Sequence, residues 1–273
     1  MSEDPRATSP DPALRRESYL RRYLRISPVP LALWRAIEAK YFAQAELADP
    51  VLDLGCGFGE FASVFFDNPV AAGIDIRRAD LVRAISGQRY KSLCLADARE
   101  MPFLNETFAT VISVSVLEHI PRLQEAVAET YRVLRKGGAF VFTATTPKFN
   151  DFLFFNSVLK KARLSPLGRL YVAVLTRAFN HASLVSQEDW LGLLERTGFQ
   201  VEQQRLTISR RALVTFELTV PLATTSQVRR LLLGNRGPRR PDFLVNFWER
   251  RLAKYVDEDE DDGCNLFVIA RKP

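Results

Sequence analysis

The sequence predicts an α/β fold, because short apolar runs typical of buried strands alternate with segments that have a helical pattern. Three observations support this prediction. An apolar run enters a glycine-rich turn near residue 55, two later runs each end in an acidic residue, and a helical segment with a glycine stop precedes another apolar run near residue 140. With 273 residues, 47% of them hydrophobic, the chain suffices for one α/β domain with insertions, or at most two domains.

The first apolar run, residues 51–54, leads directly into a turn with glycine at alternating positions, Gly55, Gly57 and Gly59. Glycine has no Cβ, so the backbone can take positive φ and pass close to a ligand. The apolar stretch 61–66 indicates a helix after the turn, whose first N–H groups would face that ligand. Strand, turn and helix together predict a site of the nucleotide-binding type.

Spacing separates the ligand classes that use such a turn. A phosphate-binding P-loop requires Gly-Lys-Ser/Thr, which does not follow this turn. The dinucleotide motif G-x-G-x-x-G would place its third glycine at position 60, which is Glu60. A carboxylate there would repel a pyrophosphate, so NAD and FAD do not fit.

The letters V-L-D-L-G-C-G-F-G at residues 51–59 resemble the first motif of class I S-adenosylmethionine (SAM)-dependent methyltransferases, in particular the ubiquinone/menaquinone-biosynthesis-like branch that acts on small molecules. SAM carries no phosphate, so a glutamate after the turn is compatible with it. Further segments resemble the family in the same order: the runs ending at Asp75 and Asp97, L-E-H-I at 117–120, and L-R-K-G-G at 134–138. The resemblance covers residues 50–146.

The resemblance implies a Rossmann-like, seven-stranded methyltransferase sheet with helical cap insertions, and SAM as the cofactor. Asp75 would accept hydrogen bonds from the ribose hydroxyls, Asp97 from the adenine amino group, and Asp53 would engage the methionine end. The positions expected to contact the cofactor are Asp53, Gly55, Cys56, Gly57, Phe58, Gly59, Asp75, Ile76, Asp97, Ala98, Arg99, Ser113, Val114 and Ser115.

Two histidines are candidates for a catalytic base. His119 ends the predicted fourth strand, near the expected position of the methyl group, and His181 precedes a predicted helix. The alternative for His119 is that it lines the pocket, and the alternative for His181 is a hydrogen bond that braces a loop. No metal-binding cluster is visible in the sequence, so no metal is expected.

The remaining elements have local signals. Residues 13–26 have a basic amphipathic pattern, and 187–197 form a predicted helix with Ser186 as N-cap and Gly198 after its last turn. Residues 199–206 and 265–271 are predicted to form strands. The organisation expected is a disordered tail at 1–12, N-terminal helices at 13–47, a SAM-binding core at 48–146, a cap insertion at 147–185, a core helix and strand at 186–206, a second insertion at 207–263 and the last core strand at 264–273.

Both insertions are apolar and basic, and residues 152–187 contain no acidic residue. We expect a helical cap that recognises an apolar acceptor with a negative group. The three cysteines are odd in number and far apart, which indicates a reducing compartment. No apolar stretch of 18 residues occurs. We therefore predict a cytoplasmic protein, with peripheral membrane contact as a further expectation.

Three functions remain compatible with the sequence. The favoured one is methyl transfer to an oxygen or carbon atom of a small-molecule or lipid-like acceptor. The second is an RNA or protein methyltransferase, although the basic segments lack the regular aromatic interleaving of a nucleic-acid groove, so nucleic acid is not expected as a partner. The third is a non-catalytic SAM-binding module that contacts an anionic membrane surface through the N-terminal basic helix. The oligomeric state is not predicted.

Overall fold

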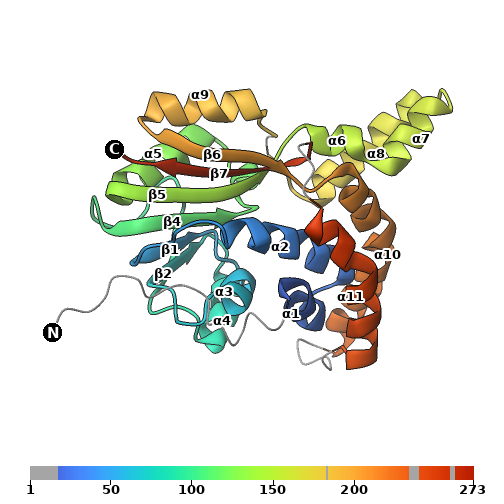
Figure 1. The fold of residues 1–273 in the computed structure, drawn as a ribbon, viewed down its shortest axis with the longest axis horizontal. Helices are drawn as coiled ribbons and strands as arrows, with labels where there is room; N and C mark the ends of the chain where they lie inside the picture. Colours follow the sequence, from blue (N-terminus) through green and yellow to red (C-terminus); the bar gives the residue numbers. More distant parts are fainter. Residues whose placement is uncertain (1–17, 183, 234–239, 259–261) are drawn as a thin grey trace.

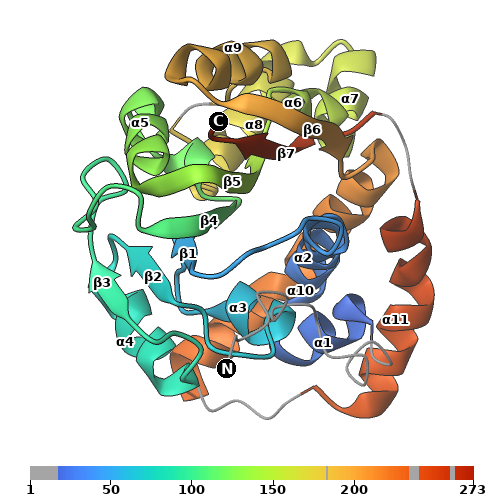
Figure 2. The same cartoon turned by 60° about the vertical axis from the view of Figure 1, so that its left-hand side comes forward.

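In the computed structural model the chain forms one mixed sheet of seven strands with helices on both faces (Figures 1 and 2). The structure describes residues 18–182, 184–233, 240–258 and 262–273. The tail predicted at 1–12 therefore lies outside the described residues. The strand order is β3-β2-β1-β4-β5-β7-β6, which confirms the predicted fold class.

The first five strands are parallel, β7 is antiparallel to β5, and β6 is antiparallel to β7. The strands are β1 (Val51–Leu54), β2 (Ala72–Asp75), β3 (Leu93–Leu95), β4 (Phe108–Val114), β5 (Leu134–Thr145), β6 (Gln200–Thr207) and β7 (Asn265–Arg271). Because β1, β4, β7 and the part of β5 from Gly138 onward occupy the middle of the sheet, they are buried on both faces and are rich in apolar residues.

Two apolar cores lie on the two faces of the sheet. Helices α2 (Val29–Phe42) and α3 (Glu60–Phe65) pack into one core, and α5 (Leu123–Val133) and α9 (Gln187–Thr197) into the other. Helix α4 (Arg78–Gly87) packs beside β2 and β3. The predicted ends of α9 are confirmed, since the Ser186 hydroxyl accepts a hydrogen bond from the Asp189 N–H at 3.2 Å and Gly198 has a φ of 102°.

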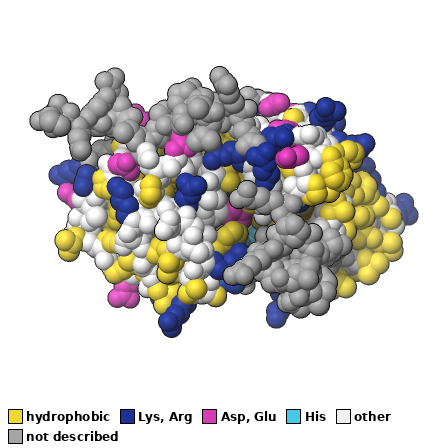
Figure 3. Space-filling view, turned by 90° about the horizontal axis from the view of Figure 1, so that it is seen from below, with side chains coloured by type: hydrophobic (Ala, Val, Ile, Leu, Met, Phe, Trp, Pro, Cys, Tyr) yellow, Lys and Arg dark blue, Asp and Glu magenta, His cyan; other side chains and the backbone are white. Residues whose placement is uncertain are grey.

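The helices of the two insertions gather beyond the carboxyl ends of the parallel strands, together with α1 (Tyr19–Ile26) (Figure 1). They are α6 (Lys148–Phe152), α7 (Phe154–Lys161), α8 (Ser165–Ala178), α10 (Arg210–Leu233) and α11 (Asp242–Asp257). Helix α10 packs against α2 and α6, and α11 packs against α1 and α2. Hydrophobic side chains are also numerous on the surface at this end (Figure 3). Among the described residues, no helix has the length and apolar character that a membrane crossing requires.

The predicted boundary between α5 and β5 was wrong. The sequence indicated a helix to residue 135 and a strand from 139, whereas α5 ends at Val133 and β5 begins at Leu134. The pairing with β4 shifts register between Phe108 and Thr110, and Gly137 has a φ of 73°. Gly137 and Gly138 therefore lie in an irregular part of β5 rather than at a helix end. The extra residues that β5 has here relative to β4 require the backbone to bend.

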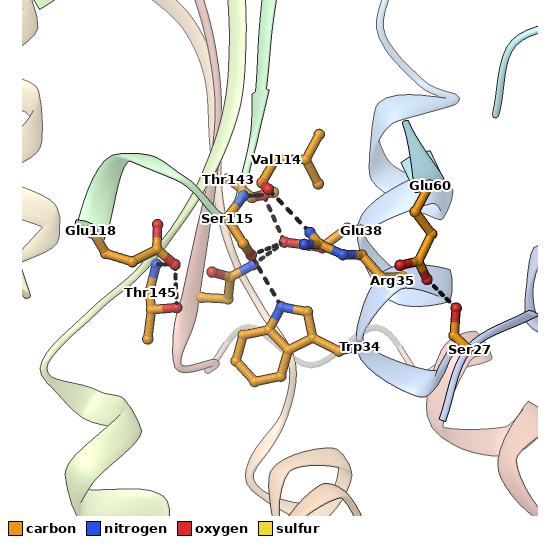
Figure 4. Close-up of polar contacts among 11 residues, drawn as sticks. Ser27, Trp34, Arg35, Glu38, Glu60, Val114, Ser115, Glu118, Thr143 and Thr145 are labelled. Carbon is orange, nitrogen blue, oxygen red and sulfur yellow. Dashed lines mark hydrogen bonds and ion pairs between the residues drawn. The ribbon is translucent and has the colours of Figure 1, made fainter. Parts of the chain in front are cut away.

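A buried carboxylate joins α2 to three strands (Figure 4). Glu38 is completely buried, and its Oε1 accepts hydrogen bonds from Ser115 Oγ at 2.5 Å, Thr143 Oγ1 at 2.7 Å and Asn265 Nδ2 at 3.3 Å. These partners lie just after β4, in β5 and in β7. Its Oε2 lies 2.8 Å from Arg35 Nη1. The carboxylate therefore has partners on both oxygens, which a buried charge requires.

Arg35 is held by the same network. Its Nη1 also donates to the Val114 carbonyl at 3.1 Å. Burial lowers the pKa of the guanidinium, but the nearby Glu38 and Glu60 side chains outweigh this effect, so the pKa of Arg35 is raised. The Arg35 guanidinium therefore stays charged, and Glu38 is its hydrogen-bonded partner.

We expect Glu38→Ala to lower the free energy of unfolding by about 3–5 kcal/mol, because it leaves the Arg35 charge buried without a partner. Urea denaturation monitored by circular dichroism measures this change. Glu38→Gln keeps an acceptor oxygen and should cost less. Glu202→Ala, which removes an exposed partner of Arg271 at 2.7 Å, is the surface control and should cost about 1 kcal/mol or less. Equal decreases in the free energy of unfolding for Glu38→Ala and Glu202→Ala would contradict the conclusion that Arg35 depends on Glu38 as its buried partner.

Candidate active site

An open groove of about 580 Å³ lies at the carboxyl ends of β1, β2 and β3. Its walls include apolar side chains such as Ile74, Val116 and Ile120. The predicted cofactor residues that line it are Gly55, Asp75, Ile76, Asp97, Ala98 and Arg99. The structure therefore brings together residues from three separate sequence motifs at one edge of the sheet.

The glycine turn has the backbone that its sequence predicts. Gly55, Gly57 and Gly59 have φ values of 77°, 53° and 78°. A Cβ on Gly55 would lie 2.3 Å from a methyl carbon of Val116, whereas the Cβ position of Gly57 has no neighbour within 4 Å among the described residues. Gly55 therefore permits close packing inside the protein, and Gly57 leaves the turn open on the side where a ligand would approach.

Asp75 stands at the end of β2 with its carboxylate fixed by the backbone. Its Oδ2 accepts a hydrogen bond from the Gly57 N–H at 2.9 Å, and its Oδ1 accepts one from the Arg77 N–H at 2.8 Å. A carboxylate has about four acceptor positions, so Asp75 retains capacity for two ligand hydroxyl groups. This geometry fits the predicted contact with a ribose.

Asp97, at the other end of the groove, is already bound by a guanidinium. Arg99 Nη2 lies 2.5 Å from Asp97 Oδ2, and Arg99 Nε lies 3.0 Å from Oδ1. The side-chain hydrogen bonds from Arg99 lower the pKa of the Asp97 carboxyl. An adenine amino group that contacts Asp97 would share the carboxylate with Arg99.

Several predicted cofactor residues do not line the groove: Asp53, Cys56, Gly57, Phe58, Gly59, Ser113 and Val114. Ser115 instead lines a second cavity described below. Ser113 Oγ donates to the Leu54 carbonyl at 3.2 Å, and the Phe58 ring stacks under the Arg83 guanidinium at 4.1 Å. Direct contact of these residues with the cofactor stays a prediction.

Asp53 is buried behind the turn, where Tyr90 is its partner. The Tyr90 hydroxyl donates to Asp53 Oδ2 at 2.7 Å, and burial raises the pKa of the Asp53 carboxyl to about 6. The Tyr90 ring lies 3.1 Å from the Cβ position of Gly59 and 2.8 Å from that of Gly73. Sequence reasoning missed Tyr90, because nothing local to residue 90 indicates contact with residues 53, 59 and 73.

The residues of the groove fit SAM. Its two fixed carboxylates suit hydroxyl and amino donors, and its apolar walls suit an adenine ring. Arg99 is the one lysine or arginine among the described residues that line the groove, and Asp97 neutralises it. A nucleoside without phosphate therefore matches this donor set, whereas a pyrophosphate would meet two acids.

A second cavity of about 530 Å³ adjoins the groove, and His119 lines both. Aromatic side chains form much of its wall: Trp34, Phe149, Phe179 and Phe216. Its polar lining residues are Arg35, Ser115, Glu118, His119, Thr145 and His181. Trp34 and Phe149 are also members of the buried core, so the same rings belong to the core and to the wall of this cavity.

The two candidate bases lie together in this second cavity. The ring centroids of His119 and His181 are 5.5 Å apart and the rings are stacked. His119 Nδ1 lies 3.0 Å from the Asn180 carbonyl oxygen, which requires a proton on Nδ1. In the neutral ring Nε2 is then the acceptor. Burial lowers the pKa of His181 to about 4, so His181 is neutral at pH 7.

Glu118 is a further polar residue of the cavity that the sequence did not single out. It is 3% exposed, and its Oε1 accepts a hydrogen bond from Thr145 Oγ1 at 2.8 Å. Its Oε2 and the Nδ1 of His181 have no hydrogen-bond partner among the described residues. Burial raises the pKa of the Glu118 carboxyl. Among those same residues, no group of three or more His, Cys, Asp and Glu side chains could hold a metal ion.

Comparison with known proteins shows what this chain is similar to. Residues 52–142 match the family model described as a methyltransferase domain. Demethylmenaquinone methyltransferase of Symbiobacterium thermophilum is 29% identical over 135 residues, which cover 45% of this chain and 53% of that protein. A protein of Mycolicibacterium smegmatis named "Probable S-adenosylmethionine-dependent methyltransferase" is 29% identical over 235 residues, which cover 82% of this chain and 81% of that one.

The fold is also similar to that of known methyltransferases. The crystal structure of a SAM-dependent methyltransferase from Thermotoga maritima superimposes with a TM-score of 0.54 at 16% identity, covering 96% of this chain and 95% of that one. The fold is thus that of the Rossmann-like SAM-dependent methyltransferases. Residues 52–142 therefore carry a methyltransferase domain, which agrees with the predicted family and with SAM as the predicted cofactor. It spans about half the length of several curated relatives that it matches.

We expect Asp75→Ala to weaken SAM binding tenfold or more, on the order of 1.4 kcal/mol. The substitution removes the acceptor for the ribose hydroxyls and leaves the Gly57 N–H without its partner. Calorimetric titration with SAM and with its demethylated product measures the change. Asp80→Ala, in the first turn of α4 and outside the groove, is the matched control. An affinity equal to that of the wild type would contradict the assigned position of the ribose.

Asp53→Asn should make stability less dependent on pH. The folded-state pKa of about 6 lies above the ordinary value of 3.8, so the wild-type protein loses stability as pH rises through this window. Asparagine keeps an acceptor for Tyr90 but has no charge. At pH 8 the variant should be more stable by roughly 1–3 kcal/mol, with no difference below pH 4. Urea denaturation at both pH values measures this difference in stability. A difference that does not change with pH would show that the raised pKa of Asp53 is not its cause.

Proposed function

We propose that this chain transfers the methyl group of SAM to an oxygen or carbon atom of a small-molecule or lipid-like acceptor, apolar and with a negative group. The observation that carries the proposal is the junction of the two cavities at His119. The groove has the residues that fit a nucleoside, and the adjoining cavity has an aromatic wall. An acceptor in the second cavity would therefore lie next to the reactive end of a cofactor in the first.

The lining of the second cavity supports an apolar acceptor. Trp34, Phe149 and Phe216 pack with their rings edge to face, at centroid distances of 6.1 Å and 5.4 Å from Trp34. Such rings offer a large apolar surface with defined geometry. Arg35 lines the same cavity and uses its Nη1 for Glu38 and Val114. Its Nε and Nη2 groups are the donors that we assign to a negative group of the acceptor.

The chemistry requires little of the protein beyond alignment and proton removal. SAM supplies a methyl group that its sulfonium already activates. The cavity walls hold the acceptor atom in line, and alignment of this kind contributes roughly 7–11 kcal/mol in well-oriented reactions. A hydroxyl or an activated carbon must also lose a proton. His119 Nε2 and the neutral His181 ring are the acceptors that we assign to that proton.

The alternatives have less support. RNA or protein methylation rests on the basic insertions alone. The non-catalytic membrane module rested on the N-terminal basic helix, but the apolar side chains of α1, Leu20, Tyr23 and Leu24, are buried in the core. Helix α1 therefore does not present these residues to a bilayer. A cytoplasmic location and peripheral membrane contact stay predictions.

We expect His119→Asn to reduce turnover roughly 10²–10⁴-fold if His119 is the base, with SAM affinity changed less than twofold. His181→Asn tests the second candidate in the same way. The measurement is formation of the demethylated cofactor with a panel of hydroxyquinones, phenols and fatty acids. Arg122→Ala, an exposed residue that pairs with Glu125 at 2.9 Å, is the control.

Unchanged turnover in both histidine variants would exclude a histidine base. Absence of turnover with every acceptor of the panel, despite SAM binding, would count against the proposal that the acceptor is a small molecule. Salt-dependent retention of RNA would then favour the second function.

A further inference from the structure

Helices α7 and α8 expose an apolar surface on the outer side of the first insertion, which we call the α7–α8 face. Its members have exposed fractions between 39% and 61%: Phe154, Phe155 and Val158 on α7, and Leu167, Leu170 and Val174 on α8. Figure 3 shows hydrophobic side chains gathered at the end of the molecule that carries these helices (Figure 1). Contiguous apolar surface of this kind marks an interaction site more often than single exposed residues do.

The spacing of these residues separates the two sides of α8. Leu167, Leu170 and Val174 recur at intervals of three and four residues and therefore share one side of the helix. Tyr171, Val172 and Leu175 pack against the core. Helix α8 is therefore apolar on both sides, and its outer side has no role in the packing of the described core.

A buried carboxylate holds the two helices in a fixed arrangement. Glu217 of α10 is 5% exposed and accepts hydrogen bonds from the N–H groups of Phe154 at 2.5 Å and Phe155 at 3.2 Å. It also accepts one from the Tyr171 hydroxyl at 2.5 Å. The Phe155 and Tyr171 rings lie 5.9 Å apart, centroid to centroid. The α7–α8 face is thus preformed, since α10 fixes α7 and α8 to each other.

The charges of this insertion are almost all positive. Exposed basic side chains are Lys160, Lys161, Arg163, Arg169 and Arg177. Residues 152–187 contain no acidic residue, and the neighbouring Asp151 pairs with Lys160 at 3.5 Å. The surface that complements this face is therefore apolar and anionic. A bilayer with anionic lipids has both properties, because acyl chains lie directly beneath charged headgroups.

The inner side of the same insertion faces the acceptor cavity. Phe149 of α6 and Phe179 after α8 line that cavity, and their rings are 6.0 Å apart. We propose that the α7–α8 face docks on an anionic membrane surface and that the insertion admits a membrane-dissolved acceptor to the aromatic cavity. The docking stands on the face itself, and the route of the acceptor rests on the function proposed above.

Vesicle sedimentation tests the docking with the full chain. We expect binding to vesicles of phosphatidylcholine with phosphatidylglycerol, and much weaker binding to phosphatidylcholine alone. Leu170→Asp should reduce binding at least tenfold, because it places a negative charge in the apolar face. Removal of a basic side chain, as in Lys161→Ser, should reduce it about fivefold on anionic vesicles. Leu104→Asp, at an 83% exposed position between β3 and β4, is the matched control and should bind as the wild type does.

SAM titration of each variant separates this proposal from the proposed function. Absence of vesicle binding in a wild-type protein that binds SAM would overturn the docking and leave methyl transfer intact. Equal loss of binding in Leu104→Asp and Leu170→Asp would also overturn it, since the effect would then be general charge repulsion. If light scattering shows a dimer that Leu170→Asp dissociates, while vesicles bind neither protein, the face is a self-association surface and the proposal is wrong.

Discussion

The buried carboxylate of Glu38 is the interaction on which the rest of the structure depends. It binds the residue after β4, a residue in the middle of the sheet in β5, and the first residue of β7, while Arg35 supplies the compensating charge. Since burial of an unpaired charge is very unfavourable, α2 has one position in which this group is satisfied. That position sets Trp34 and Arg35 in the wall of the aromatic cavity. Core packing and the wall of the aromatic cavity thus depend on the same buried carboxylate.

The aromatic cavity is assembled from parts of the chain that are far apart in sequence. Trp34 comes from α2, Phe149 from the first insertion, and Phe216 from the second, through α10. The cofactor groove, by contrast, is made by the ends of neighbouring strands. The groove and the aromatic cavity therefore come from different parts of the chain, and insertions can change without disturbing the strands. His119 lies where the two parts meet.

Local motifs predicted that Asp75 and Asp97 lie at the same edge of the sheet. Asp75 ends β2 and Asp97 lies two residues after β3. The carboxyl ends of parallel strands meet at one edge of a sheet, so their placement there follows from sequence alone. The aromatic cavity could not be predicted in this way, because an aromatic residue at helical spacing has the same pattern in a core and in a cavity wall. Tyr90 and its bond to Asp53 depend on tertiary packing, as does the bent strand around Gly137. The prediction that His119 ends the fourth strand was wrong, because β4 ends at Val114 and His119 closes a short 3-10 helix at Leu117–His119. His181 lies in the loop between α8 and α9, so the stacking of the two rings depends on how the first insertion folds back.

The place of β7 in the sheet has a consequence for the order in which the protein can be completed during synthesis. Residues 265–271 lie between β5 and β6, and those two strands have no ladder with each other. On the ribosome, β6 therefore emerges before the strand that attaches it to the sheet, separated from it by the whole of α10 and α11. Until Asn265 appears, Glu38 also lacks one of its donors. The nascent chain must keep two unpaired strand edges apart from other chains during this interval, a period in which such edges are prone to misassembly.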